Sequence, residues 1–219
     1  MHDIVQVLER PCGFERRSVA HGQPRRLLRR AIHFFSYHLI LKRRTTRRTR
    51  AAGFQLTVRP AVFHPRYFIT SEFFASFIGG LDLSGKRVAD VGTGSGVLAI
   101  AALRLGANTV VAVDADLAVL SSARENLHLN GMQGLLVNGT ADCIATAWAD
   151  VTVANISGTV LLAILEDLRR MTKNGGALIL TGFPESEAVV LRNELRTSEI
   201  VSRDGWCCLT TGRESFKGS

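Results

Sequence analysis

A chain of 219 residues, 46% of them hydrophobic, has the length of one α/β domain with a short extension, which argues against disorder. No apolar run approaches the ~20 residues that a membrane-spanning helix needs. The net charge of +8 is uneven, because residues 1–60 contain 14 Lys and Arg against 3 Asp and Glu, whereas residues 61–219 carry a net charge of −3. The basic character therefore belongs to an N-terminal arm.

The cysteines indicate a reducing compartment. Their spacing contains no C-x-x-C pair, so we expect neither a disulfide nor a metal site at Cys12, Cys143, Cys207 and Cys208. The adjacent pair, Cys207 and Cys208, is typical of the two faces of one strand. Residues 1–23 lack the regions of a secretory signal, and we expect a cytoplasmic protein.

Residues 1–53 are predicted to form the basic arm, with a helix that begins near Pro24. Residues 42–50 (KRRTTRRTR) are too charged for a core and should form a solvated segment. Three roles stay open for the arm. The first is that the arm covers the main domain with its arginines in water. The second is that it binds RNA or the ribosome, because clustered arginines neutralise phosphates. The third is that it lies on an anionic membrane surface.

A strand is expected at 54–59, followed by a loop that opens a helix near Thr70 or Ser71. His64 is interpreted as a loop histidine, with a role in proton transfer as the alternative. The next stretch, from Arg87 to Asp114, orders the rest of the chain. It reads as a strand at 88–91, a turn with glycines at every second position, a helix, and a second strand at 110–113 that ends in an acid.

The glycine turn predicts a nucleoside site. Glycines at 92, 94 and 96 let the backbone bend sharply and approach a ligand, and the following helix directs its first N–H groups toward the turn. Asp114 comes 22 residues after Gly92, near the spacing of about 20 for an acid that accepts hydrogen bonds from ribose hydroxyls. A structural glycine turn in another α/β protein is the alternative.

The glycine spacing differs from the G-x-G-x-x-G of dinucleotide folds, and Asp90 beside the turn suits the ammonium of a methionine moiety better than a pyrophosphate. This D-x-G-x-G-x-G pattern resembles the first motif of class I S-adenosylmethionine-dependent methyltransferases. The resemblance implies a Rossmann-like α/β fold and a cofactor site for S-adenosylmethionine, formed by Asp90, Gly92, Thr93, Gly94, Gly96, Asp114 and Ala115.

The chain after the turn continues the resemblance. A helix at 117–129 should end at Asn130-Gly131, and a short strand at 135–137 follows. The resemblance implies that an acid shortly after this strand contacts the adenine amino group, and Asp142 is the candidate. Asp150 also follows, but it precedes the next strand and more plausibly ends a loop.

The strand at 151–157 carries the candidate catalytic residue. Parallel strands bind ligands at their carboxyl ends, so Asn155 and Ser157 should lie near the sulfonium. Asn155 is also predicted to contact the cofactor. Methyltransferases of amides or bases have N-P-P-[YF] here, and this chain lacks both prolines and the aromatic ring. The segment ADVTVANI, the run AALRLGA and the ending GWCCLTTGR instead resemble the PrmA-like ribosomal-protein lysine methyltransferases.

Further elements complete a seven-stranded methyltransferase sheet. We expect helices at 159–171 and 185–197, a strand at 177–181, and a closing hairpin of 200–203 and 206–211 around Asp204-Gly205. The predicted methyltransferase domain covers residues 54–219. By resemblance to small methyltransferases related to the release-factor glutamine enzyme, Phe63, Pro65 and Thr70 are predicted to close over the cofactor.

These patterns predict an enzyme that methylates an amine nitrogen, with a protein as the expected substrate. RNA and small-molecule acceptors are the enzymatic alternatives. The alternative from another class is a noncatalytic nucleic-acid-binding protein with a cofactor-stabilised body. Intact acids at both the amino and ribose positions argue against a pure scaffold.

Overall fold

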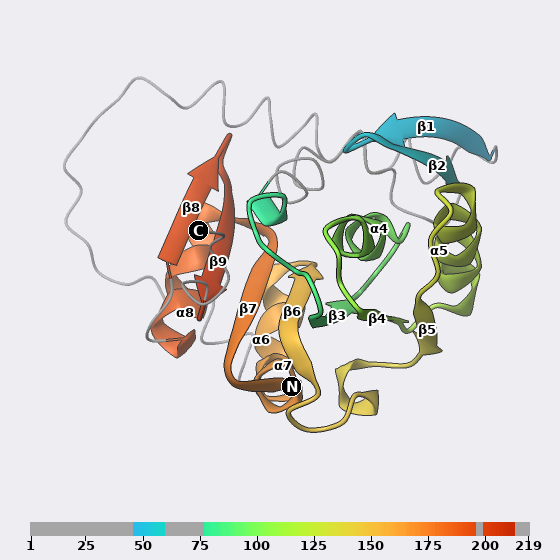
Figure 1. The fold of residues 1–219 in the computed structure, drawn as a ribbon. Coiled ribbons are helices and arrows are strands. Elements are labelled where there is room, and N and C mark those ends of the chain that lie inside the picture. Colours follow the sequence, from blue (N-terminus) through green and yellow to red (C-terminus); the bar gives the residue numbers. More distant parts are fainter. Residues whose placement is uncertain (1–45, 60–76, 196–198, 213–219) are drawn as a thin grey trace, which may run out of the picture. The chain divides into compact units, whose positions relative to one another are not determined.

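The computed structural model describes residues 46–59, 77–195 and 199–212, which belong to one compact unit (Figure 1). The predicted arm helix, Phe63, Pro65 and Thr70 lie outside these ranges. The strands are β1 (Arg47–Ala51), β2 (Phe54–Val58), β3 (Arg87–Val91), β4 (Thr109–Asp114), β5 (Leu135–Asn138), β6 (Ala149–Asn155), β7 (Thr172–Pro184), β8 (Glu199–Arg203) and β9 (Trp206–Thr211). The helices are α4 (Val97–Arg104), α5 (Leu117–Leu129), α6 (Gly158–Ala163), α7 (Leu165–Met171), α8 (Glu185–Leu195) and the 3₁₀ helix η2 (Ala141–Cys143).

The predicted seven-stranded sheet is confirmed. Its strand order is β5-β4-β3-β6-β7-β9-β8, with parallel pairing from β5 to β7 and antiparallel pairing of β9 with both β7 and β8. The order runs outward from β3 in both directions. Strands β3 and β6 are therefore neighbours whose carboxyl ends lie at one edge of the sheet, which is where such folds bind ligands.

Helices cover both faces of the sheet (Figure 1). Alternate strand residues point to opposite faces, so Val88 packs with α4 and α5, and Ala89 packs with α6, α7 and α8. Cys207 and Cys208 follow the same rule on β9, each buried in a different core cluster, as the sequence predicted. All three cysteines in the described ranges are free thiols.

The basic segment at 42–50 was expected to be solvated, which the exposed Arg48 and Arg50 bear out, but its second half also forms a strand that the sequence did not predict. Residues Arg47–Ala51 form β1, which pairs antiparallel with β2 in a separate two-stranded sheet. Arg48 and Arg50 stay exposed, while Ala51 is buried against the main core. The predicted boundary between residues 53 and 54 lies in the turn of this hairpin.

Two further elements differ from their predicted form. The helix expected at 159–171 is interrupted at Ile164, whose φ of −110° separates α6 from α7. The strand expected at 177–181 is the centre of the longer β7, which starts at Thr172 because that residue already pairs with Ala149 of β6. The closing hairpin is confirmed, with left-handed φ values at Asp204 and Gly205. No helix in the described part of the chain is long and apolar enough to cross a membrane.

Candidate active site

The sheet topology brings three of the predicted site residues to one edge. In the parallel register, Val91 at the end of β3 pairs with Val113 of β4 and with Ala154 of β6. Asp114 and Asn155 therefore follow directly on either side of the glycine turn that leaves β3. Asp90 lies one residue before the end of β3, beneath the same turn.

The turn needs glycine for reasons that differ from one position to the next. Gly92, Gly94 and Gly96 have φ values of 72°, 56° and 80°, a region that L-residues with a Cβ rarely adopt. A Cβ on Gly92 would lie 2.6 Å from Cγ2 of Ile156, and one on Gly96 would lie 3.2 Å from Cα of Ala123 on α5. These two glycines are required by the packing of the protein itself.

Gly94 is different because no residue in the described ranges crowds it. The nearest heavy atom to a Cβ at this position would be the Gly92 carbonyl oxygen, 3.9 Å away. The tip of the turn is thus open, as a backbone that approaches a ligand closely must be.

Asp90 is a buried carboxylate that lacks one partner. Its side chain is fully buried, and Oδ2 accepts hydrogen bonds from Thr93 Oγ1 at 2.6 Å and from the Ala99 N–H at 3.1 Å. Oδ1 is also buried and finds no hydrogen-bond donor among the described residues. Burial raises the pKa of Asp90 to about 7, although the two hydrogen bonds act to lower it, and the Asp114 charge adds to the rise.

Asp114 closes the turn from the side of β4. Its Oδ2 accepts the Gly94 N–H at 3.0 Å, and its Oδ1 accepts the Asp116 N–H at 3.0 Å. The carboxylate is half-buried, and each oxygen has a second lone pair that can accept from a ligand hydroxyl. Asn138, at the end of β5, donates to the carbonyl oxygens of Asp114 and Ala115, both at 3.1 Å.

The predicted adenine contact, Asp142, lies in η2 just beyond the carboxyl end of β5. Its side chain is exposed and accepts a hydrogen bond from Thr140 Oγ1. Arg170 of α7 holds this loop by donating to the carbonyl oxygens of Ala141 and Asp142, both at 3.3 Å. Sequence reasoning missed Arg170, because its role depends on a contact between distant segments.

Asn155 lies at the end of β6 against Gly182 of β7. A Cβ on Gly182 would lie 2.9 Å from Asn155 Oδ1 and within 2.7 Å of the backbone N and O of Ile156. Gly182 has a φ of 97° at a point where the β7–β9 register shifts. The sequence contained this signal, since an isolated glycine in a strand pattern indicates a bulge or a close backbone approach.

A carboxylate that sequence reasoning missed lies near the end of β6. Glu187 of α8 packs over the Cα of Gly158, three residues after Asn155. Its Oε2 is buried and accepts no hydrogen bond from any described residue. No local pattern around Glu187 predicts this position, because it depends on how α8 packs on α6.

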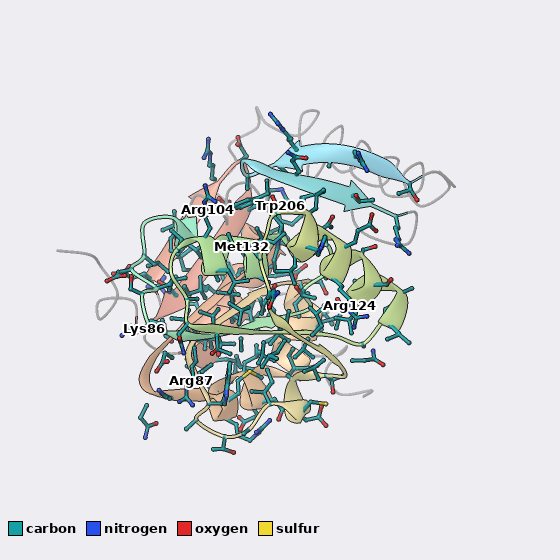
Figure 2. All side chains as sticks on the ribbon, turned by 45° about the vertical axis from the view of Figure 1, so that its right-hand side comes forward. Lys86, Arg87, Arg104, Arg124, Met132 and Trp206 are labelled. Atoms are coloured by element: carbon teal, nitrogen blue, oxygen red, sulfur yellow. The ribbon has the colours of Figure 1, made fainter. Side chains whose placement is uncertain are left out.

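Asp150 belongs to the opposite edge of the sheet. Asp150 accepts a hydrogen bond from the Arg87 N–H at 2.8 Å and forms an ion pair with Lys173. Figure 2 shows Arg87 and Lys86 at this edge. Burial acts to raise the pKa of Asp150, but the hydrogen bonds and charges of Lys173 and Arg87 outweigh it and lower the pKa. The Arg87 guanidinium also lies 5.5 Å from the ring centroid of Trp148. Asp150 therefore has a structural role away from the glycine turn.

A family model described as "Ribosomal protein L11 methyltransferase (PrmA)" matches residues 70–214, which include the glycine turn, Asn155 and the closing hairpin. The chain belongs to this family. Among curated relatives, the ribosomal protein L11 methyltransferase of Photobacterium profundum is 36% identical over 143 residues, which cover 63% of this chain and 49% of that protein. The chain thus spans about half the length of the curated L11 methyltransferases it matches.

One solved structure agrees with this family, and a second shows the shared fold. A ribosomal protein L11 methylase from Lactobacillus delbrueckii subsp. bulgaricus has 30% identity and a TM-score of 0.56, with 62% of this chain and 75% of that chain covered. A 16S rRNA N2 G1207 methyltransferase from T. thermophilus has a TM-score of 0.63, with 76% of this chain and 50% of that chain covered. At 20% identity the latter shows the shared fold alone.

Proposed function

We propose that this chain transfers a methyl group from S-adenosylmethionine to an amine nitrogen of a protein substrate. One observation carries the proposal, namely an open glycine turn between the carboxylates of Asp90 and Asp114 at the edge where β3 and β4 end. Membership of the L11 methyltransferase family agrees with it. The chain spans about half the length of these relatives, so we propose their activity and substrate class for it.

The residues of the turn fit the chemical groups of S-adenosylmethionine. Asp90 Oδ1, which has no partner among the described residues, would be the counter-charge for the amino group of the methionine moiety. The Asp114 oxygens have lone pairs left for the two ribose hydroxyls, and the bare Gly94 backbone leaves room for the nucleoside. Thr93 donates to Asp90, and Ala115 and Asp142 are the proposed contacts of the adenine end of the cofactor. Thr70, outside the described ranges, remains a predicted contact.

The chemistry needs alignment more than acid–base catalysis. When bound, the cofactor supplies a methyl group on a sulfonium, and the S–C electron pair stays on sulfur as the lone pair of the acceptor nitrogen forms the new N–C bond. The chain must hold the acceptor in line and exclude water. A desolvated site favours the neutral amine, which is the nucleophile, and the proton released on methylation passes to solvent.

Asn155 and Glu187 support an amine as the acceptor. The Asn155 amide oxygen can accept a hydrogen bond from an incoming N–H group, and Gly182 supports that oxygen from β7. The Glu187 carboxylate, which packs over Gly158 just after the end of β6, adds a negative charge that attracts a cationic side chain during approach. The prolines and aromatic ring that clamp flat amides or bases are missing after Asn155.

Contact with RNA or the ribosome is a second part of the proposal and rests on β1. Arg48 and Arg50 are exposed and lie opposite Thr57 and Gln55, so their side chains share one face of the hairpin. Two adjacent guanidinium groups suit phosphate contacts. The alternative in which the arm lies on a membrane concerns residues outside the described ranges.

Methyl transfer from labelled S-adenosylmethionine to separate protein, RNA and small-metabolite fractions tests the proposal. We expect label in the protein fraction, and we expect the Asp114→Ala variant to lose it. Label that appears only in RNA or small molecules would overturn the acceptor class. A chain that binds the cofactor but labels no fraction would favour the noncatalytic alternative.

A further inference from the structure

Two asparagines on α5 hold the β1–β2 hairpin in the same way. Asn126 Oδ1 accepts the Thr57 N–H at 2.6 Å, and its Nδ2 donates to the Thr57 carbonyl at 3.1 Å. Asn130 does the same with Gln55, at 3.2 Å and 2.7 Å. Four helical residues rise about 6 Å and two strand residues about 6.8 Å, so the two side chains match the strand repeat. The two asparagines of α5 thus form hydrogen bonds with the β2 backbone on the edge that β1 does not cover, as a neighbouring strand would.

Only Asn126 also reaches the glycine turn. Its Nδ2 donates a second hydrogen bond, at 2.8 Å, to the carbonyl oxygen of Ser95. Asn126 is fully buried, and both amide hydrogens and the amide oxygen are used. One amide group therefore connects three segments that lie far apart in the sequence, namely β2, α5 and the turn.

The bond to Ser95 fixes the peptide plane that closes the turn. The Ser95 carbonyl accepts from Asn126, and the N–H of the same peptide, on Gly96, donates to the Thr93 carbonyl at 2.9 Å. Both ends of this peptide are thus held. Its neighbour Gly96 begins α4 at a φ of 80° and lies against Ala123 of α5. A change in the position of Asn126 must therefore change the shape of the turn.

We propose that Asn126 is a positioning residue that couples docking of the β1–β2 hairpin to cofactor binding at the glycine turn. The inference rests on the proposed function, since it takes the turn to be the S-adenosylmethionine site. Coupling between two equilibria is reciprocal. A docked hairpin strengthens cofactor binding, and bound cofactor stabilises the docked hairpin by the same factor.

The other contacts of the hairpin explain docking but not coupling. Leu56 and Val58 are buried in the core, and the Arg59–Glu125 ion pair, at 3.0 Å, is exposed and contributes little. Asn130 binds β2 as Asn126 does, and its remaining bond goes to the Asn126 carbonyl within α5. Asn130 is therefore the matched control, because it shares the docking role and its side-chain hydrogen bonds go to Gln55 and Asn126 rather than to the turn.

The test compares Asn126→Ala with Asn130→Ala by calorimetric titration of S-adenosylmethionine, with thermal melting of each variant. Both variants lose two bonds to β2. We expect Asn126→Ala to raise the cofactor Kd by at least about fivefold, the lower end of common coupling factors, and Asn130→Ala to change it by less than about twofold. Equal changes in the two variants, or none in Asn126→Ala, would overturn the proposal.

A second measurement uses the unmodified chain and so does not depend on the folding of a variant. Amide hydrogen exchange of Thr57 should slow by at least about fivefold when S-adenosylmethionine saturates the chain. The Arg87 amide, bound to Asp150 at the opposite edge, should not change. Cofactor binding without slower Thr57 exchange would overturn the coupling alone. A chain that binds no cofactor would overturn the proposed function as well.

Discussion

Replacing Asp90 by asparagine should make the cofactor-free protein more stable at neutral and alkaline pH. The amide oxygen can keep both bonds now made to Oδ2, from Thr93 Oγ1 and from the Ala99 N–H. The amide nitrogen then takes the position of Oδ1, which has no hydrogen-bond partner among the described residues. The main difference between the two side chains is therefore the charge.

The magnitude follows from the pKa. Burial raises the pKa of Asp90 from 3.8 to about 7, so the folded state favours the protonated acid. The contribution of Asp90 to the free energy of unfolding is fully present below pH 3.8 and is lost as the pH rises through about 7. Three pKa units correspond to about 4 kcal/mol in the free energy of unfolding. The buried amide N–H of the variant costs about 1–3 kcal/mol at every pH.

The variant should therefore be the less stable protein below pH 4 and the more stable one, by about 1–3 kcal/mol, above pH 7. Urea unfolding of both proteins at a series of pH values, without cofactor, measures the difference. Asp150→Asn provides the contrast, because the pKa of Asp150 is lowered and its contribution is lost as the pH falls. A difference between Asp90→Asn and wild type that stays constant from pH 4 to 8 would refute the assignment of a neutral, buried acid.

The same substitution should weaken cofactor binding. An ammonium needs the ionised form of Asp90, so the affinity of the wild type for S-adenosylmethionine should rise between pH 5 and pH 7 and then level off. The variant lacks the charge and should bind at least about tenfold more weakly at pH 7.5, since hydrogen bonds to charged groups contribute about 1.5–3 kcal/mol. A variant with wild-type affinity would remove Asp90 from the cofactor site.

Three further predictions concern the turn and the end of β6. Gly94→Ala should lower the free energy of unfolding by about 1–2 kcal/mol. Gly131→Ala should lower it by the same amount, because Gly131 has a φ of 68° and equally open surroundings among the described residues. Calorimetry should show lost cofactor binding only in Gly94→Ala, and equal affinities would indicate a merely structural turn. Asp114→Ala should weaken cofactor binding by about 1.5–3 kcal/mol in a folded protein, and unchanged affinity would exclude the ribose contact. Asn155→Ala should lower turnover by ~10²-fold with little change in cofactor Kd, and full activity would remove Asn155 from the mechanism.

The strand–turn–helix–strand unit around the glycines was predictable because its signals are local. Alternating burial, the glycine positions and the closing Asp114 all lie within 28 residues of sequence. The hairpin around Asp204-Gly205 is similar, since two adjacent residues with left-handed φ determine the turn. Strand β1 was missed because RRTRA shows no apolar alternation, and its pairing with β2 and its docking on α5 depend on contacts outside the segment.

Other features depend on tertiary structure in the same way. The apolar spacing of residues 159–171 continues across Ile164, so the sequence contains no sign of the break between α6 and α7. Asn126 reads as an ordinary helical polar residue, and only its three bonds to β2 and Ser95 reveal a role. Glu187 comes near the end of β6 through the packing of α8. The roles of Asp90, Asp114 and Asn155 remain predictions that the variants above can test, and the adenine contact of Asp142 also remains a prediction.

The location of the transferred methyl group tests the central claim most directly. A protein acceptor fraction treated with the chain and S-adenosylmethionine, then digested and sequenced by mass spectrometry, should contain the added methyl groups on amine nitrogens. The Asn155→Ala variant should give the same products more slowly. Methyl groups found instead on glutamine amides, or on bases of purified RNA, would contradict the proposed amine acceptor.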